Sequence, residues 1–238
     1  MKIQALTLYL LYASCGYSAQ AQNVEITRQS TFEAQGKSQS LAFITTPADT
    51  SLFNFVATLK ATGDRGTGIE TLYYKLKDKA QKMGANAFCL ANYRPGDSAQ
   101  PSALVLDCFY GQDSVLIRNS HHREKNVVYV FASTRGSDKT SAFKIDNIKK
   151  ELAGGVYLRQ PVDSGRELKI SKGGMMGASM WIKWQQDKPA TYLTLTGLGL
   201  AETPFTPGQV NVGFTLGRIS YMDDDLGCLL ALLLKKEE

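Results

Sequence analysis

The sequence predicts an α+β fold in which a small strand-strand-helix-strand-strand domain is followed by an antiparallel β-sandwich. Three observations support this. The first half contains one clear amphipathic helix pattern with short apolar runs on both sides. From Val127 onward, apolar residues fall almost entirely in short runs separated by turn residues, which is typical of antiparallel sheets. Between the two patterns, residues 118–126 are polar and without periodicity.

The chain has 238 residues, enough for two small domains that each bury a core. We predict a signal peptide over residues 1–21 and an N-terminal extension over 22–39. A small α/β domain is expected over 40–117, an interdomain linker over 118–126 and the β-sandwich domain over 127–238.

The first 21 residues have the pattern of an export signal. Lys2 supplies a positive charge, residues 3–13 an apolar run, and Ala-Gln-Ala at 19–21 a small-x-small cleavage site. The run is too short for a transmembrane helix. As an alternative, Ala-Ser-Cys at 13–15 resembles the end of a lipobox, in which Cys15 would be lipidated. Both interpretations predict an exported protein of the periplasm or cell envelope, released or tethered to the outer membrane.

Charge and histidine content exclude several function classes. The 27 basic and 22 acidic residues are spread along the chain, which favours solubility and does not predict nucleic-acid binding. The two histidines, His121 and His122, are adjacent, so on an extended chain they point to opposite sides and do not chelate one metal ion. No Gly-x-Ser-x-Gly motif is present. We therefore predict no catalytic residue, no metal and no cofactor.

The first half contains strand-like runs at 41–45 and 52–59, followed by the predicted helix. Thr67 is its expected N-cap, Glu70 would complete a capping box, and Gly84 is expected to end the helix in a left-handed conformation. The apolar residues that share one face of this helix are Ile69, Leu72, Tyr73, Leu76, Ala80 and Met83.

The segment before this helix is a candidate anion site. Backbone N–H groups at a helix N-terminus bind anions, and Arg65 would add positive charge beside Gly66, Thr67 and Gly68. The Lys-Ser/Thr ending of a phosphate-binding loop is missing, because Gly68 is followed by Ile-Glu. A flexible capped turn is the alternative.

Cys89 and Cys108 lie in two β-like runs joined by a turn-rich segment around Ser98. In a hairpin folding at that turn, the two cysteines face each other, so a cross-strand disulfide is a candidate in an oxidising compartment. The alternative is a pair of buried free thiols. Cys228 is expected to be a thiol in the core.

Strand-like runs in the second half lie at 127–131, 141–145, 156–158, 168–170, 180–184, 192–195 and 209–216. Trp181, Trp184 and Tyr192 suggest an aromatic face for sugars, although mixed core and edge packing is the favoured interpretation. Residues 229–234 are expected to close the sandwich as a short helix or strand. If they are helical, the acidic residues 223–225 would cap the helix; calcium binding there is the less favoured alternative.

Two resemblances extend these predictions. Residues 80–87, Ala-Gln-Lys-Met-Gly-Ala-Asn-Ala, close a helix and open a strand in a way that resembles the α/β domains of Rcs-type outer-membrane stress-sensor lipoproteins. That resemblance implies a disulfide-tolerant sensor or binding domain without catalysis. It leaves Cys89 and Cys108 as the only candidates to match the bridges of those sensors.

The second half is similar to bacterial envelope domains of unknown function with a transthyretin-like or carboxypeptidase-regulatory-like sandwich. This similarity implies a binding or presentation module with no active site. The segments that carry it are Val-Tyr-Val-Phe at 128–131, Gly-Val-Tyr-Leu-Arg at 155–159, Lys-Pro-Ala-Thr-Tyr-Leu at 188–193 and Asp-Asp-Asp-Leu-Gly at 223–227.

The sequence therefore predicts an exported, non-enzymatic envelope protein acting as a binding, presentation or assembly module. Its expected partner is an envelope protein, a glycan or a lipid, and it would touch a membrane only through a lipid anchor. One alternative is a disulfide-containing sensor lipoprotein of the envelope. Another is an envelope enzyme that uses Arg65, the carboxylates or a cysteine nucleophile.

Overall fold

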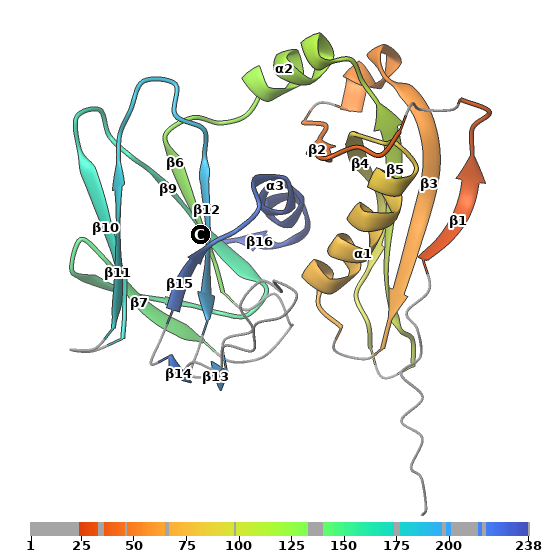
Figure 1. The fold of residues 1–238 in the computed structure, drawn as a ribbon. Coiled ribbons are helices and arrows are strands. Elements are labelled where there is room, and N and C mark those ends of the chain that lie inside the picture. The colour runs from red at the N-terminus through yellow and green to blue at the C-terminus, as the bar shows by residue number, and fades with distance from the viewer. Residues whose placement is uncertain are drawn as a thin grey trace, which may run out of the picture.

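The computed structural model has an α+β fold with three helices and three larger sheets among its described residues (Figure 1). The predicted signal peptide with Cys15 lies outside these residues, as do Arg65, Gly66 and most of the strand predicted over 209–216. The described ranges are 24–32, 36–45, 47–64, 67–97, 99–132, 140–173, 177–196, 199–200, 214–215 and 218–237.

The N-terminal half forms a five-stranded sheet in the order β1-β3-β5-β4-β2. Strand β2 runs parallel to β4, and the other neighbours are antiparallel. Edge strand β1 lies in the segment predicted to be an extension, so the sheet begins earlier in the chain than expected. A 3₁₀ helix, η1 (Pro47–Leu52), connects β2 to β3. The strands are β1 (Val24–Gln29), β2 (Ala42–Phe43), β3 (Asn54–Gly63), β4 (Ala87–Arg94) and β5 (Ser102–Tyr110).

Helix α1 (Ile69–Lys82) packs on this sheet through the predicted apolar stripe, of which Ile69, Leu72, Tyr73, Leu76 and Ala80 are buried. Its start differs from the prediction, because Gly68 is the N-cap and not Thr67. The Thr67 N–H closes a turn onto the Asp64 carbonyl at 2.9 Å, and a Cβ on Gly63 would lie 2.5 Å from the Thr67 Cβ. Thr67 therefore belongs to the tight turn before the helix.

The end of α1 confirms the prediction for Gly84. Gly84 has a φ of +81°, and its N–H donates to the Gln81 carbonyl at 3.0 Å. The Ala85 N–H donates to the Ala80 carbonyl, also at 3.0 Å. These two hydrogen bonds are those of a Schellman motif, which uses a left-handed glycine to satisfy the last carbonyls of a helix.

Helix α2 (Asp113–His121) was not expected, and its last turn lies in the predicted linker. Val115 and Leu116 pack, partly buried, against a hydrophobic cluster of the N-terminal half, and Asn119 is the buried residue of the helix. The Asn119 amide donates to the Phe43 carbonyl at 2.8 Å, and its oxygen accepts from the Thr45 N–H at 3.0 Å. A side-chain amide thus fastens α2 to the chain around β2, an interaction that hydrophobic periodicity does not reveal.

The C-terminal half is a sandwich of two sheets, ordered β15-β12-β6-β9-β16 and β11-β10-β7-β8. Apolar side chains from both sheets fill the space between them, among them Val130, Ile170 and Leu193. Two pairs depart from the antiparallel prediction, since β12 runs parallel to β6 and β16 parallel to β9. The strands are β6 (Val127–Phe131), β7 (Ser141–Ile145), β8 (Ile148–Leu152), β9 (Val156–Pro161), β10 (Glu167–Lys172), β11 (Ala178–Lys183), β12 (Thr191–Thr196), β15 (Arg218–Tyr221) and β16 (Lys235–Lys236). A separate short pair consists of β13 (Gly199–Leu200) and β14 (Phe214–Thr215).

Helix α3 (Asp224–Leu233) lies between the sandwich and the N-terminal half (Figure 1). Its buried residues Leu226, Leu229 and Leu230 belong to the same hydrophobic cluster as α1 of the first half and β6 of the second. All residues of β6 are buried, because Val128 and Val130 face the sandwich interior while Tyr129 and Phe131 face α3. The two halves therefore share this cluster, in addition to the separate cluster inside the sandwich.

Polar contacts at the start of α3 join the same elements. The Asp223 carboxylate is the N-cap and accepts from the N–H groups of Asp225 and Leu226, which confirms the predicted capping. Asp223 also pairs with Lys77 of α1 at 2.6 Å. The Asp225 carboxylate accepts from the Phe43 N–H at 2.8 Å and pairs with Arg123. The acidic segment thus holds α3 against both α1 and β2.

Candidate functional site

The candidate disulfide between Cys89 and Cys108 is not formed, and the structure has the alternative arrangement, in which Cys89, Cys108 and Cys228 are all free thiols. In the hairpin of β4 and β5, Cys89 pairs with Asp107, and Phe88 pairs with Cys108. Adjacent residues of a strand point to opposite faces, so the two thiols lie on opposite sides of the sheet. The cause is a bulge between Leu90 and Asn92. On the turn side of the bulge, from Asn92 to Arg94, the pairing differs by one residue. If that pairing continued along β4, it would place Cys89 opposite Cys108.

A cavity of about 380 Å³ lies where the two halves meet, and we call it the junction pocket. The N-terminal sheet contributes residues next to β2 and in β4, the segment after α2 contributes three, and the sandwich contributes one tyrosine from each of three adjacent strands. Helix α3 supplies the remaining wall. The lining residues are Phe43, Ile44, Thr45, Cys89, Leu90, His122, Arg123, Glu124, Tyr129, Tyr157, Tyr192, Cys228, Ala231 and Leu232.

The three tyrosines make an aromatic wall. The rings of Tyr129 and Tyr192 are stacked with centroids 5.0 Å apart, and Tyr157 lies 5.7 Å from Tyr129. The Tyr129 hydroxyl donates to the Glu124 carboxylate, which also pairs with Arg159 at 2.9 Å. The Tyr192 oxygen lies 3.1 Å from the Cys228 sulfur. These hydroxyls are occupied by neighbouring groups, so the wall presents mainly ring surface.

Arg123 is the main cationic group of the pocket, and its side chain is only 17% exposed. One guanidinium nitrogen donates to the Asp225 carboxylate and, at 3.3 Å, to the Phe43 carbonyl. The Nε of Arg123 is buried with no hydrogen-bond partner among the described residues, and the same holds for the Thr45 hydroxyl. Both orphaned atoms belong to residues that line the pocket. A buried polar atom without a partner is costly, and it commonly marks the place of a water or ligand.

The thiols of the pocket are in their protonated state at neutral pH. Burial, together with the charge of Asp107, raises the pKa of Cys89 to about 11. Burial also raises the pKa of Cys228 above its ordinary value, although Tyr192 and Arg123 oppose this. A nucleophilic cysteine needs a lowered pKa, so neither thiol has the electrostatic environment of a catalytic nucleophile.

The other titratable groups that line the junction pocket and have shifted pKa values are also moved away from neutrality. Burial raises the pKa of Tyr129 and Tyr192, with Glu124 and Cys228 respectively adding to the effect. The hydrogen bond from Arg159 lowers the pKa of Glu124. For Arg123, burial favours deprotonation, but Asp225 outweighs it and the pKa is raised. None of these groups is tuned for proton transfer near pH 7.

Tyr192 is part of the aromatic wall of the junction pocket, but the other remaining predicted site residues are not among its lining residues. Thr67 and Gly68 lie at the start of α1, and the rest of the candidate anion site falls outside the described residues. Tyr192 is buried, Trp184 packs against the sandwich core and Trp181 is exposed, so these three do not form one aromatic face. Within the described ranges, no cluster of three or more His, Cys, Asp or Glu could hold a metal ion.

Sequence reasoning did not identify Thr45, Arg123, Tyr129 or Tyr157 as pocket residues. Arg123 lies in the polar stretch interpreted as a linker, and the tyrosines lie in strands interpreted only as core. The one available signal was β6, whose uninterrupted apolar run indicates burial on both faces.

No helix in the described part of the chain is both long and apolar enough to cross a membrane. Comparison with family models, curated proteins and solved structures found no match to this chain.

Proposed function

We propose that this chain is an exported, non-enzymatic envelope protein that binds a small, mainly apolar ligand in the junction pocket. The observation that carries the proposal is the pocket itself, a cavity of about 380 Å³ with an aromatic wall at the meeting point of the two halves. Export and envelope location rest on the signal-like pattern of residues 1–21.

The composition of the pocket supports small-molecule binding. Ligand sites have volumes of about 300–1,000 Å³, predominantly apolar and aromatic linings and a few polar groups that orient the ligand. Here Phe43, Leu90 and the tyrosines supply apolar surface, and Thr45 and Arg123 supply polar groups. Since the charges of Arg123 and Glu124 are already matched by Asp225 and Arg159, an uncharged ligand fits better than an ion.

The electrostatics favour binding over catalysis. A thiol, carboxylate or phenol acts as a catalyst near neutral pH when its pKa is shifted towards neutrality. The pKa values of Cys89, Glu124 and Tyr129 are shifted in the opposite direction. Because Cys89 and Cys108 are free thiols, the structure offers no support for the alternative of a disulfide-containing sensor.

The neutral fluorescent probe N-phenyl-1-naphthylamine tests the proposal. Its emission increases in apolar sites, so titration should give a saturable signal with the wild-type protein. Ala231→Phe would place a ring in the pocket and should weaken probe affinity by about tenfold or more, equivalent to about 1.4 kcal/mol. Ala142→Phe is the matched control, because Ala142 is exposed on β7 and does not line the pocket.

Circular dichroism and the thermal midpoint would establish that both variants are folded. An unchanged probe affinity in folded Ala231→Phe would contradict the junction pocket as the binding site. Absence of saturable probe binding by the wild type would argue against the proposal altogether.

A further inference from the structure

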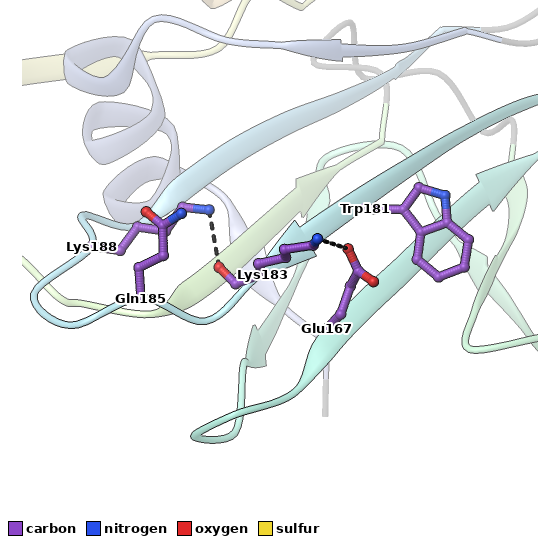
Figure 2. A pocket seen from close by; sticks show the side chains of 5 residues that line it. All are labelled: Glu167, Trp181, Lys183, Gln185 and Lys188. Atoms are coloured by element: carbon purple, nitrogen blue, oxygen red, sulfur yellow. Dashed lines mark hydrogen bonds and ion pairs between the residues drawn. The ribbon is translucent and has the colours of Figure 1, made fainter.

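A second concave surface lies on the outer face of the β11-β10-β7-β8 sheet, and it shares no lining residue with the junction pocket. It is an open groove of about 580 Å³, and we call it the sheet groove. Figure 2 shows its lining side chains on β10, β11 and the segment after β11. They are Glu167, Trp181, Lys183, Gln185 and Lys188.

The strand register places Trp181 on the solvent side. In the β10–β11 pair, Trp181 is opposite Lys169, and Lys183 is opposite Glu167. The alternate pair, Leu168 and Ile182, is buried inside the sandwich. The outward position of Trp181 therefore follows from the same alternation that builds the core, and a shift of one residue would bury the indole and expose Ile182.

Trp181 is an exposed aromatic ring in charged surroundings. Trp181 is 55% exposed, and the Lys169 ammonium lies 4.9 Å from the centroid of its ring. Tryptophan combines a large apolar area with an N–H donor, which makes it a frequent anchor for binding partners. Lys169 restricts the ring without covering it, so the indole is held in place while ring surface remains open to a ligand.

The charge around the ring is positive. Lys183 Nζ lies 3.8 Å from the Glu167 carboxylate, and Lys188 Nζ donates to the Lys183 carbonyl at 3.1 Å (Figure 2). With Lys169, which lies over the Trp181 ring, the groove and its edge carry three ammonium groups, whereas Glu167 is the one carboxylate among the lining residues. Each ammonium has three N–H donors, so Lys183 and Lys188 keep donors for a ligand. The Gln185 amide adds donor and acceptor atoms at the same edge.

We propose that the sheet groove binds an anionic glycan. A sugar ring would stack its C–H face on the Trp181 indole, its acidic group would lie near Lys183 and Lys188, and a hydroxyl group would hydrogen bond to Gln185. An open groove suits a chain of sugar rings, which can enter and leave along its length. This site is separate from the junction pocket and does not depend on the ligand bound there.

The surroundings of Trp181 favour a glycan over a lipid surface. Insertion into a bilayer interface requires several neighbouring apolar side chains. The outward positions next to Trp181 are instead Lys169, Lys183 and Ser179. A single aromatic ring among polar groups is sufficient to stack one sugar ring, but it offers little area to acyl chains.

Isothermal titration of the folded chain with a linear oligogalacturonate, compared with the matching neutral galactose oligomer, tests the proposal. We expect the anionic oligomer to bind more tightly, with an affinity that falls as salt concentration rises. Trp181→Ala should weaken binding by about tenfold, and Trp181→Phe should restore part of the loss. Lys188→Gln should weaken the anionic oligomer and leave the neutral one unaffected. Tyr221→Ala is the control, because Tyr221 is an exposed aromatic residue outside the groove.

Equal binding by wild type and folded Trp181→Ala would overturn the proposal, as would failure of the wild type to bind the oligogalacturonate. Vesicles of phosphatidylglycerol provide the other comparison. Trp181-dependent binding to these vesicles without binding to the oligomer would assign the groove to a membrane surface instead.

Discussion

At Gly227, helix α3 packs closely against Tyr192 of the sandwich, and replacement of this glycine by alanine tests how the two halves are joined. A Cβ on Gly227 would lie 2.7 Å from the Tyr192 Cβ, and two atoms of the Tyr192 ring would be closer still. Ordinary van der Waals contact begins at about 3.5 Å between carbon atoms. The helix and the buried ring of Tyr192 must therefore separate to admit one methyl group.

Two effects of opposite sign determine the result of Gly227→Ala. Replacing a mid-helix glycine by alanine stabilises a helix by about 1 kcal/mol. Overpacking a core costs about 1–3 kcal/mol, and the upper end applies because the contacts are with a buried ring and not with a flexible side chain. The expected net loss in the free energy of unfolding is about 2 kcal/mol. At this chain length that corresponds to a decrease of about 4–8 °C in the thermal midpoint.

Urea denaturation followed by circular dichroism measures the stability change, and N-phenyl-1-naphthylamine affinity reports on the junction pocket, which Tyr192 lines. In a Tyr192→Ala background the ring is gone, so the added methyl should cost less than in the wild type. A Gly227→Ala variant as stable as the wild type, with unchanged probe affinity, would refute the close packing of α3 on β12.

Three further predictions concern the charges and thiols around α3. Asp225→Asn should lower the free energy of unfolding by about 2 kcal/mol in urea denaturation, because it leaves the partly buried Arg123 without its carboxylate partner. Asp78→Asn, which removes an exposed ion pair with Lys82, should lower it by less than about 0.5 kcal/mol. Burial works to raise the pKa of Asp223, but the hydrogen bonds from Lys77 and the α3 N–H groups outweigh it and lower the pKa. The resulting stabilisation of the fold should be present at neutral pH and disappear as the pH falls below about 4. In a plot of the free energy of unfolding against pH, Lys77→Gln should make the decrease in this acidic range smaller. In unfolded, unreduced protein, Cys89, Cys108 and Cys228 should all react with a thiol reagent. In the native state Cys108 should be protected, because it is buried and burial raises its pKa. A disulfide-linked Cys89–Cys108 peptide in a non-reducing digest would contradict the register of β4 and β5.

The hairpin of β4 and β5 illustrates what can be predicted from local sequence and what cannot. The turn around Ser98 and the two strands follow from residue composition, and the predicted pairing holds from Asn92 to Arg94. A bulge near Ala91 then changes the pairing by one residue. Such a bulge inserts an extra residue without a distinctive composition, so the sequence does not reveal it. It nevertheless reverses the conclusion about Cys89 and Cys108, because a one-residue change moves a side chain to the other face.

Elements with strong local signals were predicted well, and elements held by distant partners were not. Helix α1 combines a regular apolar stripe with a terminal glycine, and both features agree with the structure. Strand β8 follows a two-residue turn at Asp146 and Asn147, both with positive φ, but it is not among the predicted strand-like runs because most of its residues are charged. Helix α2 is held by the packing of Val115 and Leu116 and by the hydrogen bonds of Asn119 to the chain near β2, and no local pattern encodes those distant hydrogen bonds.

The junction pocket was beyond sequence reasoning for a related physical reason. Helix α3 lies between strands β15 and β16 of the sandwich in the chain, yet it contacts α1 and β2 of the first half as well as β12 of the second. A cylindrical helix between two sheet-based layers does not fill the space where its curved surface turns away from them. The side chains around that space come from seven separate parts of the chain, so their proximity depends on the completed fold. Because residues of both halves line the pocket, a ligand bound there contacts both of them. Its binding should therefore stabilise the fold of each half and also the packing of the two halves against each other.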